Sequence, residues 1–278
     1  MRGAFTRAAG TAIIESVCGR TLLWALLPEG GSGMPETVRR GYAPGDAREF
    51  GEKALPLLRR AQRDIFYLVS RGYALERAVT FVGDRFQFSA RQRMALARAT
   101  CSRGSLLGRR RRECGGDLAG KTLLVDGFNL IIPLEIALSR STLILCMDGA
   151  VRDLAGLHGS YRLIDKTDRA IRLAGDELAA LGVAGARFYL DAPISNAGRL
   201  RQRILALLKD APFAAEAVLS DHVDGMLLGR EFVATGDSAI LDRCVSWVNL
   251  TARILRRRMP GYPLIDLSLP DALEWMPA

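Results

Sequence analysis

Acidic residues recur along this 278-residue chain at the points where short apolar segments end. Residues 123–125, 143–147, 186–190, 217–219 and 232–234 are apolar runs of the length expected for buried strands. The acids that follow these runs are Asp126, Asp148, Asp191, Asp221 with Asp224, and Asp237. Parallel strands end on a common edge of their sheet, and ligands of open α/β sheets bind there. We therefore expect these carboxylates to converge on one crevice.

Carboxylates that converge repel one another unless they are protonated, well separated or bridged by cations. Histidine and cysteine ligands are scarce, because the chain has two histidines and five scattered cysteines without a Cys-x-x-Cys pair. A cluster of oxygen ligands alone selects Mg²⁺ or Mn²⁺, which can activate water and stabilise an in-line phosphoryl displacement. The alternative to metal binding, for each of these residues taken alone, is a local structural role, because aspartate favours turns and caps the following helix.

The elements between these acids predict how the chain folds. Helical patterns at 133–138, 168–181 and 199–209 alternate with the apolar runs, which indicates βαβ units and a mostly parallel sheet. The odd number of cysteines and the absence of a disulfide pattern favour a reduced, cytoplasmic setting. No apolar run approaches the roughly 20 residues that cross a bilayer, so we expect no membrane span.

The part of the chain before these strands is strongly basic. Residues 39–112 hold 18 Arg and Lys against 6 Asp and Glu, whereas the whole chain has a net charge of +9 and a pI of about 9.7. Helical patterns cover 46–72, 74–82 and 89–100, and Ser89 with Gln92 forms the pattern of a capping box. Either this is a helical unit with a solvated basic surface, or it holds a nucleic-acid backbone through residues such as Arg91 and Arg98.

Three regions are therefore predicted. Residues 1–33 form a poorly defined extension, after which Met34 is a possible start. Residues 34–116 form a basic helical domain that ends in a linker beginning at Arg109. Residues 117–278 form an α/β domain.

Residues 115–122, Gly-Gly-Asp-Leu-Ala-Gly-Lys-Thr, match the Walker A pattern. Because the apolar strand follows this loop instead of preceding it, we expect no phosphate loop there.

Two segments carry a resemblance to a known superfamily. Val125-Asp126-Gly127-Phe128-Asn129 and Thr235-Gly236-Asp237-Ser238 resemble the first and last acidic motifs of PIN/NYN-like nucleases, and Asp221 to Leu228 resembles the third. This resemblance implies a three-layer PIN-like α/β domain and a Mg²⁺- or Mn²⁺-dependent ribonuclease. Its metal ligands would be Asp126, Asp224 and Asp237, with Asp221 as an alternative to Asp224 and Asp191 as a further ligand.

The acid that the superfamily places on an intervening helix has no single equivalent in this chain. Glu135, Asp148 and Asp153 are all candidates, and Asp148 is included among the expected catalytic residues. Asn129, Ser195 and Asn196 are expected to contact substrate, although the last two have no counterpart in the superfamily pattern.

A closer resemblance links the chain to an uncharacterised prokaryotic family, domain of unknown function 434, over about residues 39–250. The segments that carry it include Arg71-Gly72-Tyr73, residues 81–86, Arg91-Gln92-Arg93, residues 191–196 and residues 235–238.

The leading hypothesis is a ribonuclease in which the basic helical unit holds RNA, in preference to DNA, and the α/β domain cleaves it. The alternative is a PIN-like protein that binds nucleic acid without turnover. A phosphatase of haloacid dehalogenase type is disfavoured, because Phe128 stands where that chemistry needs a second aspartate.

Overall fold

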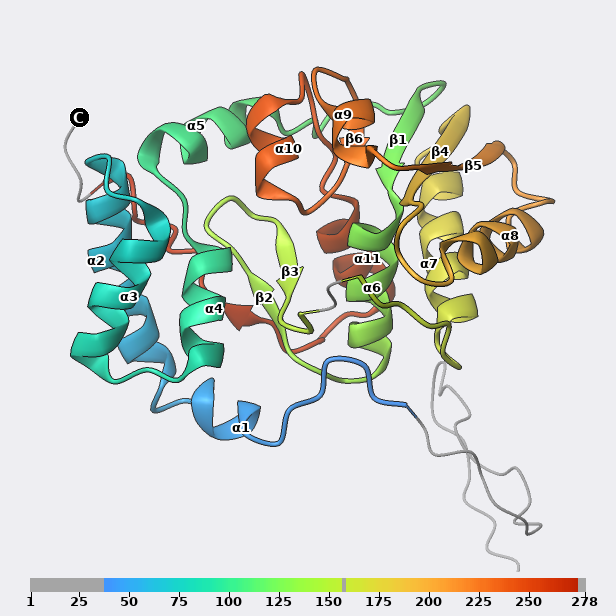
Figure 1. Cartoon of the computed structure of the whole chain (residues 1–278). Coiled ribbons are helices and arrows are strands. Elements are labelled where there is room, and N and C mark those ends of the chain that lie inside the picture. Colours follow the sequence, from blue (N-terminus) through green and yellow to red (C-terminus); the bar gives the residue numbers. More distant parts are fainter. Residues whose placement is uncertain (1–37, 157–158, 275–278) are drawn as a thin grey trace, which may run out of the picture. The chain divides into compact units, whose positions relative to one another are not determined.

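Four of the five predicted strands form one parallel sheet. The computed structural model describes residues 38–156 and 159–274 (Figure 1). The strands β1 (Thr122–Asp126), β4 (Gly185–Asp191), β5 (Ala214–Ser220) and β6 (Val233–Ala234) lie in the order β5-β4-β1-β6. All three neighbouring pairs are parallel, so the four strands end on one edge. The expected α/β class and mostly parallel sheet are confirmed.

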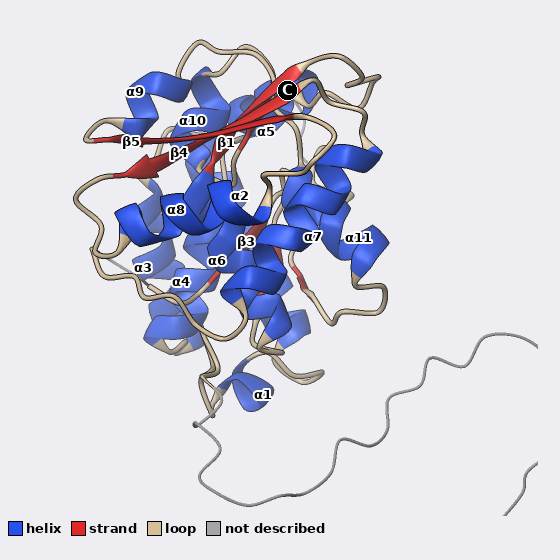
Figure 2. Ribbon diagram, turned by 90° about the vertical axis from the view of Figure 1, so that its right-hand side faces the viewer, coloured by secondary structure: helices blue, strands red, loops and turns tan. Residues whose placement is uncertain are grey.

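Helices cover both faces of this sheet because side chains alternate along its strands. Leu123 and Val125 of β1 lie in the core formed with α6 (Gly127–Leu138), α7 (Thr167–Ala180), α8 (Ala197–Leu207) and α11 (Leu250–Arg258). Leu124 and Val233 pack on the opposite face, against α9 (Val223–Leu227), α10 (Ser238–Arg243) and the buried Trp247. Figure 2 shows the strands close to edge-on, with α9 and α10 on one side and the larger helices on the other.

The segment at 143–147 does not belong to this sheet, contrary to expectation. β2 (Leu143–Leu145) pairs antiparallel with β3 (Val151–Asp153) and parallel with β7 (Ile265–Asp266), forming a separate sheet. The turn between β2 and β3 contains Asp148 and Gly149, and Gly149 has a φ of +83°, which suits glycine. A hairpin partner within a few residues displaced the longer-range pairing that the βαβ pattern predicted.

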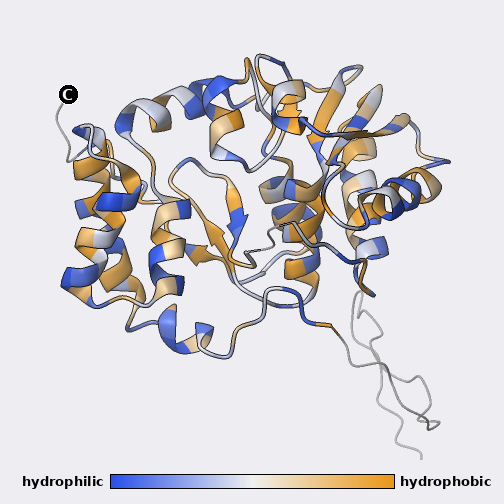
Figure 3. Cartoon of the chain, in the orientation of Figure 1, coloured by the Kyte–Doolittle hydropathy of each residue, from blue (hydrophilic) through white to orange (hydrophobic). Residues whose placement is uncertain are grey.

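Helices α2 to α5 contain most of the basic residues of 39–112 and pack together. They are α2 (Leu55–Ser70), α3 (Leu75–Phe86), α4 (Ala90–Ala99) and α5 (Arg103–Arg112). The capping box of Ser89 and Gln92 is confirmed, with both hydrogen bonds present. The apolar sides of α2, α3 and α4 bury residues against the second sheet, including Ile144 of β2 and Leu267. Figure 3 shows these apolar stripes.

Two local predictions in this region are wrong. The continuous helix expected over 46–72 is divided into α1 (Asp46–Glu49) and α2, since residues 50–54 form a turn and Pro56 lies in the first turn of α2. Arg109 to Arg112, expected to begin a linker, form the last turn of α5. Their C-terminal position on the helix is favourable, because cations there offset the partial negative charge of the free carbonyls.

The Walker-like segment leads directly into β1, so the expected order, with the loop before the strand, is confirmed. Residues 1–33 and the possible start at Met34 lie outside the described residues. Within residues 38–156 and 159–274, no helix combines the length and apolar character needed to cross a membrane.

Candidate functional site

Asp126 lies at the carboxyl end of the central strand β1 and is 2% exposed. Its carboxylate caps α6, accepting a hydrogen bond from the backbone N–H of Asn129 at 3.3 Å. The side-chain amide of Asn129 donates to Oδ2 at 2.7 Å, and the hydroxyl of Thr235 donates to the same oxygen at 2.8 Å. All three donors are neutral groups, and within residues 38–156 and 159–274 the carboxylate makes no ion pair.

Burial raises the pKa of Asp126 to about 7, against the lowering effect of the hydrogen bonds from Thr235 and Asn129. The charge of nearby Asp237 raises it further. Near neutral pH this carboxyl group is therefore divided between its protonated and ionised forms, and strongly shifted pKa values cluster at functional sites.

Thr235 connects Asp126 to the second acid of the site. Its hydroxyl oxygen accepts a hydrogen bond from the backbone N–H of Asp237 at 3.0 Å while donating to Asp126. Asp237 caps α10 through bonds from Ala239 at 2.7 Å and Ile240 at 3.1 Å. Thr235 was not identified as a site residue from the sequence, although the Thr-Gly-Asp spacing contained the signal.

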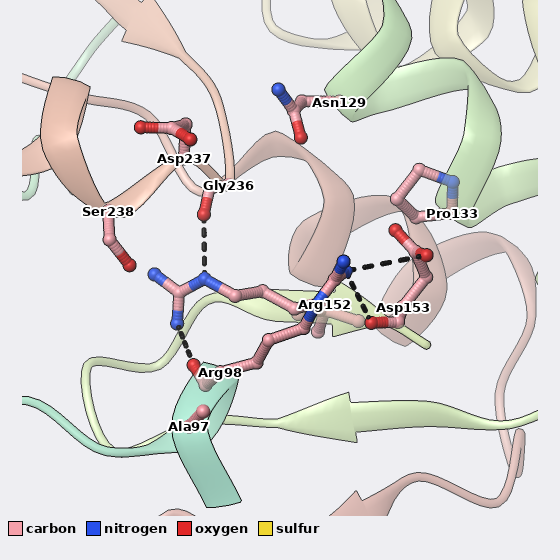
Figure 4. Close-up of a pocket in the computed structure, with 10 residues that line it drawn as sticks. Ala97, Arg98, Asn129, Pro133, Arg152, Asp153, Gly236, Asp237 and Ser238 are labelled. Atoms are coloured by element: carbon pink, nitrogen blue, oxygen red, sulfur yellow. Dashed lines mark hydrogen bonds and ion pairs between the residues drawn. The ribbon is translucent and has the colours of Figure 1, made fainter. Parts of the chain in front are cut away.

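A cavity of about 330 Å³ opens beside these residues (Figure 4). Its lining comprises Ala97, Arg98, Asn129, Pro133, Val151, Arg152, Asp153, Gly236, Asp237 and Ser238. Arg98 donates to the backbone carbonyl of Asp153 at 2.7 Å, and Nη1 lies 3.5 Å from the Asp153 carboxylate. Arg152 donates to the carbonyl of Gly236 at 2.7 Å and to that of Arg98 at 3.1 Å, so it fixes the loop that carries Asp237. The cavity thus combines carboxylate oxygens with two guanidinium groups.

Asp191 and Asp224 form a second pair of acids along the strand-end edge. Asp191 ends β4, and its pKa is raised by burial and then by the charge of Asp224. Asp224 lies exposed in the first turn of α9, and Asp221 is exposed in the preceding loop. Asp191, Asp221 and Asp224 do not line the cavity beside Asp237; Asp126 does not line it either, but it is joined to Asp237 through Thr235. The structure therefore brings Asp126 together with Asp237, and Asp191 together with Asp224.

Asp148 does not share the edge of the parallel sheet, because its strand belongs to the second sheet. Its buried carboxylate accepts from Arg109 at 2.7 Å and from both terminal nitrogens of Arg152 at 2.7 and 3.0 Å. Although burial by itself raises the pKa of Asp148, the two arginines hold it below its usual value. The expectation that this acid joins the crevice is wrong.

The other candidates for the intervening acid have different surroundings. Glu135 is fully buried, with Arg40 Nε 2.8 Å from Oε2 and the hydroxyl of Tyr161 donating to Oε1 at 2.8 Å. Asp153 lines the cavity itself.

Three residues expected to contact substrate hold the fold together. The Ser195 hydroxyl accepts from the Tyr161 N–H at 2.9 Å and donates to the Tyr161 carbonyl at 3.0 Å. Asn196 donates to that same carbonyl at 2.7 Å. Arg91 forms an ion pair with Asp46 and donates to two backbone carbonyls. By contrast, Asn129 and Arg98 lie at the cavity.

Across residues 38–156 and 159–274, no group of three or more His, Cys, Asp or Glu side chains is arranged to hold a metal ion. An ion at this edge would therefore take ligands from two carboxylates and from amide, hydroxyl or water oxygens.

Two family models match the chain. Residues 57–112 match "Protein of unknown function (DUF434)" and residues 116–253 match "Domain of unknown function (DUF5616)". The resemblance to the first, expected over about residues 39–250, is confirmed for the shorter range. The uncharacterized protein MJ0935 of Methanocaldococcus jannaschii is 32% identical over 185 residues, which are 66% of this chain and 88% of that protein. No solved structure matches the chain at a significant level.

Proposed function

We propose that this protein is a metal-dependent ribonuclease with a PIN-like α/β domain. The chain belongs to the family of unknown function described by the DUF434 and DUF5616 models, and the proposal proceeds from that membership. The proposal rests on one observation. Asp126 is a buried carboxylate at the end of the central parallel strand, next to a second acid and an arginine-lined cavity, and no residue in the described part of the chain gives it a cationic partner.

The donor set at this position fits Mg²⁺ or Mn²⁺. Oδ1 of Asp126 accepts a single hydrogen bond from the protein, so it retains capacity for a further partner. Asp237 and the side-chain oxygen of Asn129 supply further hard oxygen atoms, and Mg²⁺ commonly keeps several waters beside one or two carboxylates. When bound, the ion would supply Lewis-acid activation of water and of the phosphodiester.

The groups that line the cavity or lie beside it have roles that follow from their charge and contacts. Arg98 uses Nη1 on Asp153 and has further N–H donors available for a phosphate oxygen. Because burial raises the pKa of Asp126 to about 7, its carboxyl group must lose a proton before it can ligate an ion, so metal binding should strengthen as the pH rises to about 7. Thr235 fixes the relative positions of the two acids through its paired hydrogen bonds. We propose that Asp191 and Asp224 extend the same acidic edge.

A second candidate is a nucleic-acid-binding protein without turnover. Two observations favour it: the carboxylate of Asp126 is already occupied by three protein donors, and the described residues contain no larger acidic cluster. This protein would bind RNA with a strong salt dependence and release it uncleaved.

The experiment that separates the two candidates is cleavage of an end-labelled single-stranded RNA with Mn²⁺ or Mg²⁺. We expect metal-dependent cleavage that falls at least 100-fold in Asp126→Asn and in Asp237→Asn. Asp210→Asn is the matched control, because Asp210 is exposed in the turn after α8 and should leave the rate unchanged. Arg98→Gln should mainly raise KM if Arg98 binds a phosphate.

Cleavage that persists in Asp126→Asn would contradict the proposed site. Binding without cleavage by the wild-type protein, over a range of RNA sequences and both metals, would favour the second candidate.

A further inference from the structure

A groove of about 520 Å³ lies between α2 and α3, outside the site described above. Its lining comprises Arg60, Arg63, Asp64, Tyr67, Leu68, Phe81, Val82 and Arg85. Two of its aromatic side chains are unusually open to solvent, with Tyr67 45% exposed and Phe81 70% exposed. The groove is therefore apolar along its floor and open to a large ligand.

The exposure of these rings is not explained by packing of the helices. Leu58 and Ile65 of α2 and Val79 and Val82 of α3 already form the buried contacts of the helix pair. Phe81 is not among these buried contacts and is exposed at the edge of the groove, where a polar residue would serve solubility better. An exposed aromatic group beside a groove is a feature of binding surfaces.

The groove is also positively charged. Arg60, Arg63 and Arg85 face one acid, Asp64, among its lining residues. Arg60 and Arg85 make no ion pair with any residue in the described ranges, and Arg63 pairs with the exposed Asp271, a contact of little energetic weight. Outside the lining, the guanidinium of Arg71 lies 5.0 Å from the ring centre of Tyr67.

We propose that this groove binds single-stranded nucleic acid, with bases stacked on Phe81 and Tyr67 and phosphates held by Arg60 and Arg85. Stacking on aromatic rings together with a basic rim is the arrangement by which proteins bind single strands irrespective of sequence. The inference extends the proposed function by naming the surface that holds the RNA strand. The proposed phosphate contacts therefore lie on the α2–α3 face and not at Arg91, which is paired with Asp46.

The test is fluorescence anisotropy with a 5′-labelled 12-nucleotide uridine RNA and the full chain, in EDTA so that no divalent ion contributes. Phe81→Ala and Tyr67→Ala should each weaken binding about tenfold, the loss of one stacked base. Phe81→Trp should retain affinity, because an indole ring stacks equally well. Tyr42→Ala is the matched control: Tyr42 is 51% exposed and lies outside the groove, so its loss should not change the affinity.

The charge part of the proposal has its own readout. Arg85→Gln should lower the slope of log affinity against log salt by about 0.7, the value for one phosphate contact on a single strand. Arg187→Gln is the matched control, since Arg187 is an exposed arginine paired with Glu216 on β4 and β5.

Unchanged affinity in Phe81→Ala and Tyr67→Ala would overturn the proposal, as would tighter binding of a duplex or of an acidic peptide that displaces the RNA from this groove. Failure of the proposed ribonuclease function would be a separate result. In that case the wild-type protein would not cleave RNA in the presence of metal, but the Phe81 and Tyr67 variants would still bind RNA more weakly in EDTA and Asp126→Asn would bind it normally.

Discussion

Asp126 and Asp148 are the same residue type in the same local sequence, an apolar strand followed by Asp-Gly, and each is 2% exposed. Their surroundings differ in charge. Asp148 lies between Arg109 and Arg152, whereas Asp126 accepts hydrogen bonds from the neutral groups of Asn129 and Thr235. The pKa of Asp148 is accordingly lowered, and that of Asp126 is raised to about 7.

The difference separates a structural carboxylate from a candidate functional one. The charge of Asp148 is offset by arginines that also connect α5 to α10 through Asp242 and position the loop at Gly236. The charge of Asp126 is offset by no cationic side chain among the residues described, and Asp237 adds a second negative charge close by. A divalent cation is the partner that would complete this second arrangement.

The largest effect is expected from neutralising the paired acid. Asp148→Asn would leave Arg109 and Arg152 buried with insufficient negative charge, which typically costs about 3–5 kcal/mol of stability. Asp126→Asn should not destabilise the protein at pH 7, because no buried cation among the described residues depends on Asp126 and the neutral amide avoids the cost of burying a carboxylate. Urea unfolding of both variants measures the contrast. Equal losses would show that Asp126 also has a structural charge partner.

The second prediction concerns pH. Asp126 titrates near pH 3.9 in an unfolded chain and near 7 in the folded protein. Between these values the folded state alone holds the proton, so stability falls by about 1.4 kcal/mol per pH unit as pH rises, and the fall ends above pH 7. Asp126→Asn should lack this decline. For Asp148 the sign is opposite, since its lowered pKa gives stability that is lost as pH falls through the acid range.

Wild-type and Asp126→Asn proteins with parallel stability curves from pH 4 to 8 would contradict the raised pKa. The difference between the two curves isolates this one group, because every other titrating residue is common to both.

A smaller effect is expected from the glycines that follow the two acids. A Cβ on Gly127 would lie 2.5 Å from Cδ2 of Leu190 and 2.9 Å from the carbonyl oxygen of Tyr189, so Gly127→Ala should cost about 1–3 kcal/mol. A Cβ on Gly149 would make only an ordinary contact, 3.6 Å from Nδ2 of Asn249, but the φ of +83° is strained for alanine, so Gly149→Ala should cost about 1 kcal/mol. Thermal unfolding compares them. A larger loss for Gly149→Ala would reverse the assignment of crowding to Gly127.

Much of the parallel sheet could be predicted from the sequence because its signals are local. Apolar runs mark β1, β4, β5 and β6, and the intervening helical patterns indicate parallel connections. The same pattern misassigned β2, since a run of apolar residues does not specify its pairing partner, and the nearby β3 forms a hairpin with it. Arg109 was expected in a linker because a run of arginines looks like a solvated linker. Its acidic partners, Asp148 and Asp242, are far away in the sequence and become apparent only in the fold.

The site was predictable only in part for the same reason. Asp126 and Asp237 follow strands of one sheet, so topology alone brings them together. Whether Ser195 contacts substrate or closes a loop depends on Tyr161, which is 34 residues away and carries no sequence signal of that contact. The exposed face of Phe81 likewise becomes visible only once the buried faces of α2 and α3 are known.

The most direct test of the central claim, that Asp126 and Asp237 hold a divalent cation, is a Mn²⁺ titration followed by electron paramagnetic resonance. The account predicts at least one bound ion whose affinity rises with pH up to about 7, as Asp126 loses its proton, and which is lost in both Asp126→Asn and Asp237→Asn but kept in Asp210→Asn. Mn²⁺ binding that is absent from the wild-type protein, or that is unchanged in Asp126→Asn, would contradict it.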